Sequence, residues 1–294
     1  MGLLLSTSIS LAAQSPHYLT SNDINALLSK PADYRLFYGK DSLQFGDLRL
    51  PNTVSKPYPV AIIVHGGCWV SKFADLHYTA ALADALRDSG IATWNIEYRR
   101  LDNSGGGWPG TFEDVGNAAD FLRVIADKYS LDLNHVITVG ESVGGQLALW
   151  LAARHRLPKN SQLYAVHPLN IKGVVVLGGV TDLKAFRKQS DFTCGSDVVG
   201  KLLNGSSSQI AAHYHETSPI ELIPLGVPQI LIYGADDKSV PKKFGETYMQ
   251  AARKAGDNVE LIIVPKAAHH EYVSPNSVTW PAVKSAVQAL LPTK

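Results

Sequence analysis

The feature that most constrains the fold of this chain is its alternation of short apolar runs with segments of helical period. Six runs are continuously apolar and rich in β-branched residues, as strands buried on both faces are: 58–64, 91–98, 135–140, 173–178, 229–234 and 259–264. Five segments carry helical spacing: 78–89, 112–129, 144–156, 242–255 and 278–291. The alternation predicts an α/β fold, with a mostly parallel sheet covered by helices on both faces.

Two other segments refine this architecture. Residues 34–38 and 43–50 flank Gly39-Lys40-Asp41 and predict an antiparallel hairpin at the start of the sheet. Residues 181–225 are longer than an ordinary crossover and predict an inserted cap over the ligand crevice, the alternative being a surface excursion without a role in binding. We therefore expect one domain over residues 31–294, preceded by an arm at 1–30.

Composition excludes several classes of protein. The 294 residues are 45% hydrophobic and carry a net charge of +1, with no long run of one sign. This predicts neither a nucleic-acid partner nor a membrane partner. A small-molecule substrate is the expected partner, and homo-oligomerisation is left open.

The N-terminal segment allows several interpretations. Residues 3–13 are apolar and Ser10-Leu11-Ala12 resembles a signal-peptidase site, but no positive region precedes them. A signal peptide or its remnant predicts a secreted or periplasmic protein, whereas a loosely packed arm predicts a cytoplasmic one. Residues 1–6 also fit the loose myristoylation pattern.

The chain has two cysteines, Cys68 and Cys194, whose spacing fits no zinc motif. We expect two separate thiols, although a fold that brings them together would allow them to pair.

Residues 140–144 read Gly-Glu-Ser-Val-Gly, with Gly145 next, between a predicted strand and a predicted helix. This placement is typical of a nucleophile elbow, a sharp turn that exposes the hydroxyl of Ser142. The glycines fit because Ser142 would adopt a sparsely allowed backbone conformation, and a Cβ on a neighbour would collide with the strand or helix.

Backbone donors for an oxyanion are expected after the predicted strand 58–64, where residues 65–69 read His-Gly-Gly-Cys-Trp. Glycines allow amides to approach a substrate oxygen. We assign donation to Gly67, with Gly66 or Cys68 as alternatives, and to Val143 after the nucleophile. His65 is expected to fix this loop by hydrogen bonds.

The carboxylate and the base follow later strands. Asp237 is the chosen acid, Asp236 is its neighbour and competitor, and Asp182 is a distant alternative; capping a helix is the ordinary role of such a residue. His269 is the chosen base, with His270 as its competitor, which completes the order Ser, Asp, His expected after such an elbow.

Paired histidines also raise a metal hypothesis. Neither His269-His270 nor the pair His213 and His215 is accompanied by an acidic or cysteine cluster. No metal is therefore predicted.

These motifs resemble the α/β-hydrolase superfamily, in the branch of small esterases with a His-Gly-Gly motif, including carboxylesterase, feruloyl-esterase-like and kynurenine formamidase-like members. The resemblance covers the chain from about residue 40 onward and rests on these stretches: 65–69, 97–99, 107–110, 140–145, 234–241 and His269. It implies an eight-stranded sheet and a triad of Ser142, His269 and Asp237 that needs no cofactor. Glu141 and Val143 fall within the family's range at their positions.

Four other residues carry structural hypotheses. Arg99 and Asp114 are predicted to form an ion pair beneath the site, the alternative being a helix cap and a solvated arginine. Trp69 and Trp108 are predicted to form an aromatic wall for the substrate, the alternative being ordinary packing of their loops.

The predicted function is hydrolysis of small carboxylic esters through an acyl-enzyme intermediate. An arylformamidase or amidase acting on an N-formyl aromatic substrate needs the same groups and is the first alternative. A non-catalytic ligand receptor on the same fold is an alternative from another class.

Overall fold

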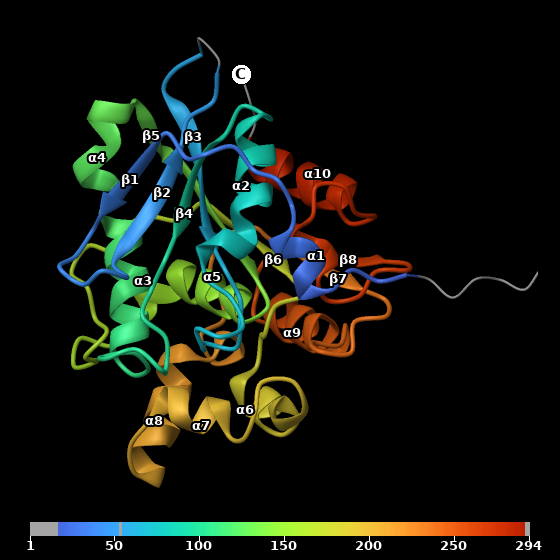
Figure 1. Ribbon diagram of the computed structural model, residues 1–294. Helices are drawn as coiled ribbons and strands as arrows, with labels where there is room; N and C mark the ends of the chain where they lie inside the picture. The colour runs from blue at the N-terminus through green and yellow to red at the C-terminus, as the bar shows by residue number, and fades with distance from the viewer. Residues whose placement is uncertain (1–16, 53–54, 292–294) are drawn as a thin grey trace, which may run out of the picture.

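The computed structural model describes residues 17–52 and 55–291 (Figure 1). Its eight-stranded sheet has the order β1-β2-β4-β3-β5-β6-β7-β8. The pairings of β1 with β2 and of β2 with β4 are antiparallel. Every later pairing along this order is parallel. The strands are β1 (Tyr34–Phe37), β2 (Phe45–Arg49), β3 (Tyr58–Val64), β4 (Ala92–Ile96), β5 (Leu131–Glu141), β6 (Gly173–Leu177), β7 (Gln229–Gly234) and β8 (Val259–Val264). The predicted mostly parallel sheet and its initial hairpin are confirmed.

Helices cover both faces of the sheet. The α-helices are α1 (Ser21–Asn25), α2 (Ala80–Arg87), α3 (Gly110–Asp120), α4 (Leu122–Tyr129), α5 (Val143–Ala153), α6 (Leu183–Arg187), α7 (Val198–Leu203), α8 (Ser207–Thr217), α9 (Lys243–Lys254) and α10 (Trp280–Leu290). Short 3₁₀ turns are η1 (Leu76–Thr79), η2 (Arg154–Arg156), η3 (Ser190–Phe192), η4 (Pro219–Glu221) and η5 (Glu271–Val273).

The central strands separate two cores. In β3, Ile62 packs into the core beneath α3, α4, α5 and α9, whereas Ile63 packs into the core beneath α1, α2 and α10. Successive strand residues point to opposite faces, so a strand covered on both sides must be apolar throughout. This explains why most of the predicted strands carry no polar alternation. β4 is an exception, and its polar side chains Thr93 and Asn95 are buried and hydrogen-bonded.

The predicted helix over 112–129 is two helices in the structure. The chain turns between α3 and α4 at Phe121, although its φ of −61° and ψ of −23° remain helical. Helical periodicity persists across this junction, which is why the sequence pattern alone indicates one helix.

Residues 181–225 follow β6 and lead into β7 as three short α-helices, α6 to α8, and two 3₁₀ turns. Figure 1 shows these helices gathered at one end of the sheet. No helix within the described residues is both long and apolar enough to cross a membrane.

The arm before residue 31 is ordered where the structure describes it. Thr20 caps α1 through a capping box, and the Leu19 amide donates to Glu271 Oε1 at 2.8 Å. Ile24 is buried against the core beneath α2 and α10. The expectation of a loose arm is therefore wrong from Leu19 onward, whereas the signal-peptide and myristoylation motifs lie outside the described residues.

Candidate active site

Ser142 lies at the junction of β5 and α5 with φ 54° and ψ −121°. Its amide donates to Leu177 O at 2.9 Å, and its carbonyl accepts from the Val180 amide at 3.0 Å. The elbow is therefore fastened to β6 and to the segment just after it. Close packing explains the glycines, since a Cβ on Gly144 would lie 2.2 Å from Val64 O.

Three of the predicted residues form one hydrogen-bonded chain. His269 Nε2 lies 3.1 Å from Ser142 Oγ, and His269 Nδ1 lies 2.8 Å from Asp237 Oδ2. Ser142 follows β5, Asp237 follows β7, and His269 follows β8. The carboxyl ends of parallel strands meet at one edge of the sheet, which is how residues so far apart in the chain come together.

The carboxylate of Asp237 is held by four donors. Oδ1 accepts from the amides of Ser239 and Val240 at 2.8 and 3.0 Å. Oδ2 accepts from the Tyr272 hydroxyl at 2.9 Å as well as from His269. The Tyr272 hydroxyl in turn accepts from the Gly234 amide at 2.6 Å, so the end of β7 orients the acid.

The charges of the site shift its titrations. Burial opposes ionisation of Asp237, but the neighbouring His269 outweighs it, so the pKa of Asp237 lies below its usual value. Burial likewise opposes a charged His269, but Asp237 outweighs it and raises the pKa of His269 to about 9. The site therefore favours an imidazolium, which is the form that proton transfer from Ser142 would produce.

The competing candidates have other contacts. Asp236 is exposed, and Asp182 caps α6 by accepting from the Ala185 amide at 3.0 Å. His270 Nδ1 lies 2.7 Å from the Tyr78 hydroxyl, and burial together with His269 lowers the pKa of His270 to about 4. None of these three residues takes part in the hydrogen bonds that link Ser142, His269 and Asp237.

The loop at residues 65–69, which is predicted to supply oxyanion donors, contributes Gly67 and Cys68 to the wall of a cavity that also contains Ser142. Gly67 has φ 92°, a conformation that favours glycine. Gly66 lies instead against Glu141, whose Oε2 would be 2.2 Å from a Cβ at Gly66. Val143 is the first residue of α5, where an amide has no acceptor within its own helix. Gly67 and Cys68 thus lie at the cavity and the Val143 amide has no acceptor within α5, whereas Gly66 packs against Glu141.

His65 fixes this loop, as predicted. Its Nδ1 lies 2.8 Å from Gly66 O, its Nε2 lies 3.1 Å from Glu97 Oε1, and its ring stacks on Tyr98. The predicted pair of Arg99 and Asp114 is also confirmed, with two side-chain contacts of 2.7 Å.

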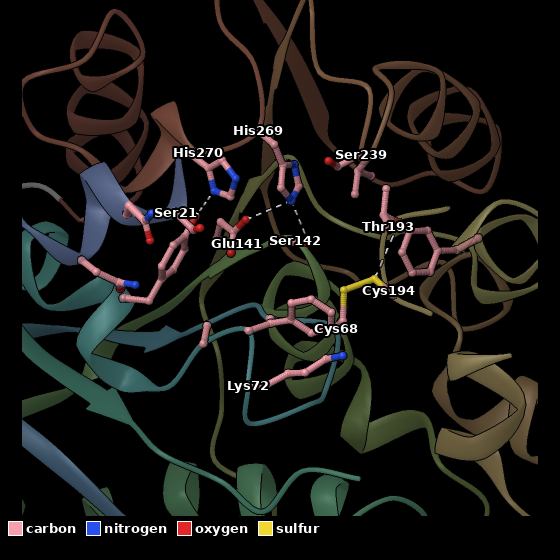
Figure 2. Close-up of a pocket in the computed structure, with 18 residues that line it drawn as sticks. Ser21, Cys68, Lys72, Glu141, Ser142, Thr193, Cys194, Ser239, His269 and His270 are labelled. Carbon is pink, nitrogen blue, oxygen red and sulfur yellow. Dashed lines mark hydrogen bonds and ion pairs between the residues drawn. A yellow bond between two sulfur atoms is a disulfide. The ribbon is translucent and has the colours of Figure 1, made fainter. Parts of the chain in front are cut away.

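A cavity of about 410 Å³ opens above Ser142 (Figure 2). Its wall is assembled from the oxyanion loop, α1, the cap and the loops that carry the triad. Most of these wall residues were not predicted to line the cavity, because several different segments of the chain contribute them and only the fold brings these segments together. They are Ser21, Asn22, Asn25, Lys72, Phe73, Ala74, Tyr78, Glu141, Phe186, Thr193, Cys194, Ser239 and Val240.

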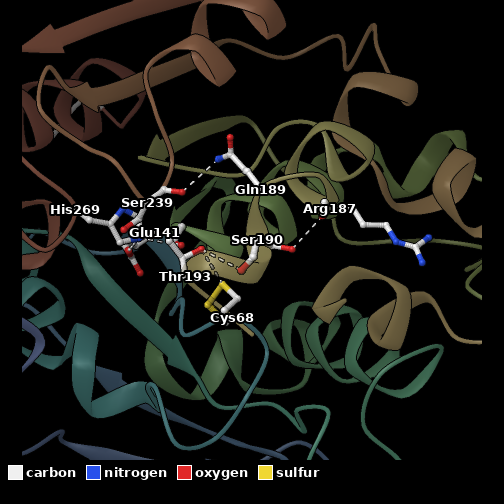
Figure 3. The surroundings of a disulfide bond; sticks show 10 residues. Cys68, Glu141, Arg187, Gln189, Ser190, Thr193, Ser239 and His269 are labelled. Carbon is white, nitrogen blue, oxygen red and sulfur yellow. Dashed lines mark hydrogen bonds and ion pairs between the residues drawn. A yellow bond between two sulfur atoms is a disulfide. The ribbon is translucent and has the colours of Figure 1, made fainter. Parts of the chain in front are cut away.

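The two cysteines form a disulfide, so the expectation of separate thiols is wrong (Figure 3). Cys68 belongs to the oxyanion loop and Cys194 to the cap, and both line the cavity. Their Cα atoms are 5.4 Å apart although 126 positions separate them in the chain. Only the tertiary fold creates this proximity, which the spacing does not encode.

Neither predicted tryptophan wall residue lines the cavity. Trp69 is fully buried and packs edge-on against Phe186 of the cap. Trp108 stacks on His213 with ring centroids 3.7 Å apart. The alternative of ordinary packing is therefore correct for both indoles. Trp69 packs against the cap and Trp108 packs against His213, and neither lines the cavity above Ser142.

The histidines of the metal hypothesis have protein partners. His213 Nδ1 contacts Leu203 O, and His215 forms an ion pair with Glu221. Over residues 17–52 and 55–291, no three His, Cys, Asp or Glu side chains are grouped as metal ligands would be.

A Ser-His-Asp chain on a strand-to-helix turn of this eight-stranded sheet defines the α/β-hydrolase class. Solved structures of this class superpose on most of the chain. Esterase B from Lactobacillus rhamnosis has a TM-score of 0.74 at 17% identity and covers 92% of this chain and 90% of its own. A truncated carbohydrate esterase from gut microbiota has a TM-score of 0.73 at 20% identity, with coverages of 88% and 98%.

The family model described as BD-FAE matches residues 47–251, and the chain belongs to this family. Among curated relatives, esterase LipC of Mycobacterium tuberculosis is 26% identical over 80% of this chain. The rice protein named "Probable isoprenylcysteine alpha-carbonyl methylesterase ICME" is also 26% identical over 80% of this chain. The matches span 59% and 57% of these two relatives' own lengths.

Proposed function

We propose that this protein is a serine carboxylesterase that cleaves small carboxylic esters. The observation that carries the proposal is the hydrogen-bonded chain from Ser142 through His269 to Asp237 at the floor of a solvent-accessible cavity. A serine hydroxyl is a weak nucleophile until an oriented base can accept its proton. The esterase names of relatives and structural neighbours support the same class.

In the proposed acylation step, Ser142 Oγ attacks the ester carbonyl carbon while His269 Nε2 takes the hydroxyl proton. The carbonyl oxygen gains the negative charge and accepts hydrogen bonds from backbone amides. The imidazolium then returns its proton to the departing alkoxide, which leaves as an alcohol, and Ser142 carries the acyl group. Asp237 keeps the Nδ1 proton in place throughout, because its carboxylate faces that nitrogen.

The same groups would complete deacylation. Water replaces the alcohol, His269 takes one of its protons, and the resulting hydroxide attacks the acyl carbon. Collapse of the second oxyanion breaks the bond between the acyl carbon and Ser142 Oγ. The His269 imidazolium returns its proton to Oγ, which restores the Ser142 hydroxyl, and a carboxylic acid leaves. Oxyanion donors of this kind contribute about 3–4 kcal/mol each to transition-state stabilisation. We assign them to the Gly67 and Val143 amides, with Cys68 as an alternative to Gly67.

Amide substrates are a second candidate class for this machinery. The human acylamino-acid-releasing enzyme is 25% identical over 72% of this chain, which covers 28% of that enzyme. Acyl amino acid derivatives are therefore substrates to examine after esters, together with the aryl formamides that the sequence resemblance implies.

A nitrophenyl ester series from acetate to decanoate tests the proposal, with Ser142→Ala as the matched variant. We expect turnover of short esters by the wild type and a loss on the order of 10⁵-fold in kcat for Ser142→Ala. Circular dichroism verifies that the variant is folded. Turnover by Ser142→Ala at the wild-type rate would contradict the nucleophile assignment.

A fluorophosphonate distinguishes the enzyme from a receptor on the same fold. An activated serine forms a phosphonyl adduct at Ser142, which mass spectrometry locates on the peptide containing that residue. Absence of labelling, together with no turnover of any ester or amide, would favour the receptor.

A further inference from the structure

Glu141 is a buried carboxyl group that the proposed mechanism does not use. Only 2% of the residue is exposed, yet its Oε1 lies 3.3 Å from His269 Nε2. The same nitrogen lies 3.1 Å from Ser142 Oγ (Figure 2). Two groups therefore compete for the nitrogen on which the proposed proton transfer depends.

The hydrogen-bond pattern requires a proton in the contact between Glu141 and His269. Nδ1 of His269 faces the Asp237 carboxylate at 2.8 Å, so that nitrogen carries a proton. In a neutral imidazole, Nε2 is then an acceptor, and an ionised carboxylate beside it would be repelled. The contact is favourable only if Glu141 is protonated and donates to Nε2, or if His269 is charged and donates to Glu141.

The rest of the Glu141 carboxyl has little to stabilise its charge. Oε2 is buried without a hydrogen-bond partner among the described residues. Burial, reinforced by the charge of Asp237, raises the pKa of Glu141 to about 7, although His269 and a hydrogen bond from the Gly66 backbone oppose the rise. Because Glu141 Oε1 and His269 Nε2 are 3.3 Å apart, the two groups titrate as a coupled pair, and their protons are lost in steps that belong to the pair.

We infer that Glu141 shares a proton with His269 and so sets the pH at which His269 is free to accept the Ser142 proton. This inference rests on the proposed esterase function. Glu141 acts through His269 and is therefore a positioning residue.

The other titratable groups around this pair are accounted for. Asp237 and Glu271 add negative charge that favours the imidazolium, and His270 adds a second imidazole. The Tyr78 hydroxyl contacts His270 Nδ1, and the Tyr98 hydroxyl donates to His65 O. Lys72 supplies the ammonium group of the same cavity wall.

The test is the pH profile of kcat/KM for Glu141→Gln, which keeps the shape of the side chain but removes its charge and its proton. Loss of a negative charge at 3.3 Å disfavours the imidazolium, so neutral His269 persists to lower pH. We expect the midpoint of the acid limb to fall by about one pH unit. Glu260→Gln is the matched control, because Glu260 is exposed at the opposite end of β8 and should leave the midpoint unchanged.

An unchanged midpoint in folded Glu141→Gln would overturn the inference, since a residue that only fills space would not move it. Nuclear magnetic resonance of wild-type protein with labelled histidine gives a second readout that needs neither turnover nor a stable variant. We expect His269 to titrate in two coupled steps. A single step near the ordinary histidine value of about 6.5 would reject proton sharing, even if the protein proved not to hydrolyse esters.

Discussion

The two sides of the catalytic cavity are held in place by different means. On the side of Ser142, regular secondary structure holds the residue in place. β5 and α5 meet at the elbow, and backbone hydrogen bonds join the elbow to β6 and to the segment after it. On the opposite side, Cys68 and Trp69 have left-handed backbones in an irregular loop, and a disulfide joins this loop to the cap. The chain of Ser142, His269 and Asp237 is thus positioned by the sheet, and the wall that contains Cys68 and Cys194 is positioned by one disulfide.

The largest expected effect comes from the sheet side. Asp237→Asn should lower kcat by about 10⁴-fold while the fold persists, because an amide no longer holds His269 in the required tautomer. Ester hydrolysis and thermal unfolding measure the two quantities. Asp236→Asn, one position earlier and exposed, should retain the wild-type kcat; equal losses in both variants would contradict the assignment of the acid.

An intermediate effect is expected on the cross-linked side. The double variant Cys68→Ala with Cys194→Ala should lose about 2–4 kcal/mol of unfolding free energy, because the disulfide no longer restricts the unfolded chain. Thr193 and Cys194 line the cavity, and in this variant the disulfide no longer holds them in place. The variant should therefore also accept esters of longer acids.

Urea unfolding with and without dithiothreitol provides the control for this prediction. The reductant should destabilise the wild type and leave the double variant unaffected. Equal unfolding midpoints for the oxidised and reduced wild type would show that the cross-link does not stabilise this wall.

The smallest effect is expected from the support beneath the site. Arg99 contacts both carboxylate oxygens of Asp114, whose side chain is fully buried. Arg99→Lys should cost about 1.5 kcal/mol in unfolding free energy, because lysine cannot make both contacts. We expect kcat of Arg99→Lys to change less than that of Asp237→Asn. If Arg99→Lys were as stable as the wild type in chemical unfolding, the second contact would contribute nothing to stability.

The difference between the two sides also explains what sequence could predict. Ser142, Asp237 and His269 each follow a buried strand, and parallel strands deliver their ends to one edge of the sheet. The order and spacing of strands therefore suffice to bring these three candidates together. The Arg99–Asp114 pair was predictable for the same reason, because a strand end and the start of α3 place it.

The opposite wall depends on contacts that no local pattern records. The left-handed backbone of Trp69 accompanies a ring that is buried against the cap, although its loop position suggested substrate contact. The docking of the N-terminal segment depends on a hydrogen bond from Leu19 to Glu271, 252 positions away. The sequence motif gave no special role to Glu141, because its side chain comes close to His269 only in the folded protein.

Ser142 lies between the two cysteines in the chain, so the disulfide closes a covalent ring that contains its own strand and helix. The exposed residues 158–160 are part of this ring. A protease that cuts the chain there separates the backbone carrying Ser142 from that carrying His269, yet the two fragments remain one molecule. Such nicked protein would migrate as one band without reductant and as two bands with it, and the ring would keep its catalytic halves together.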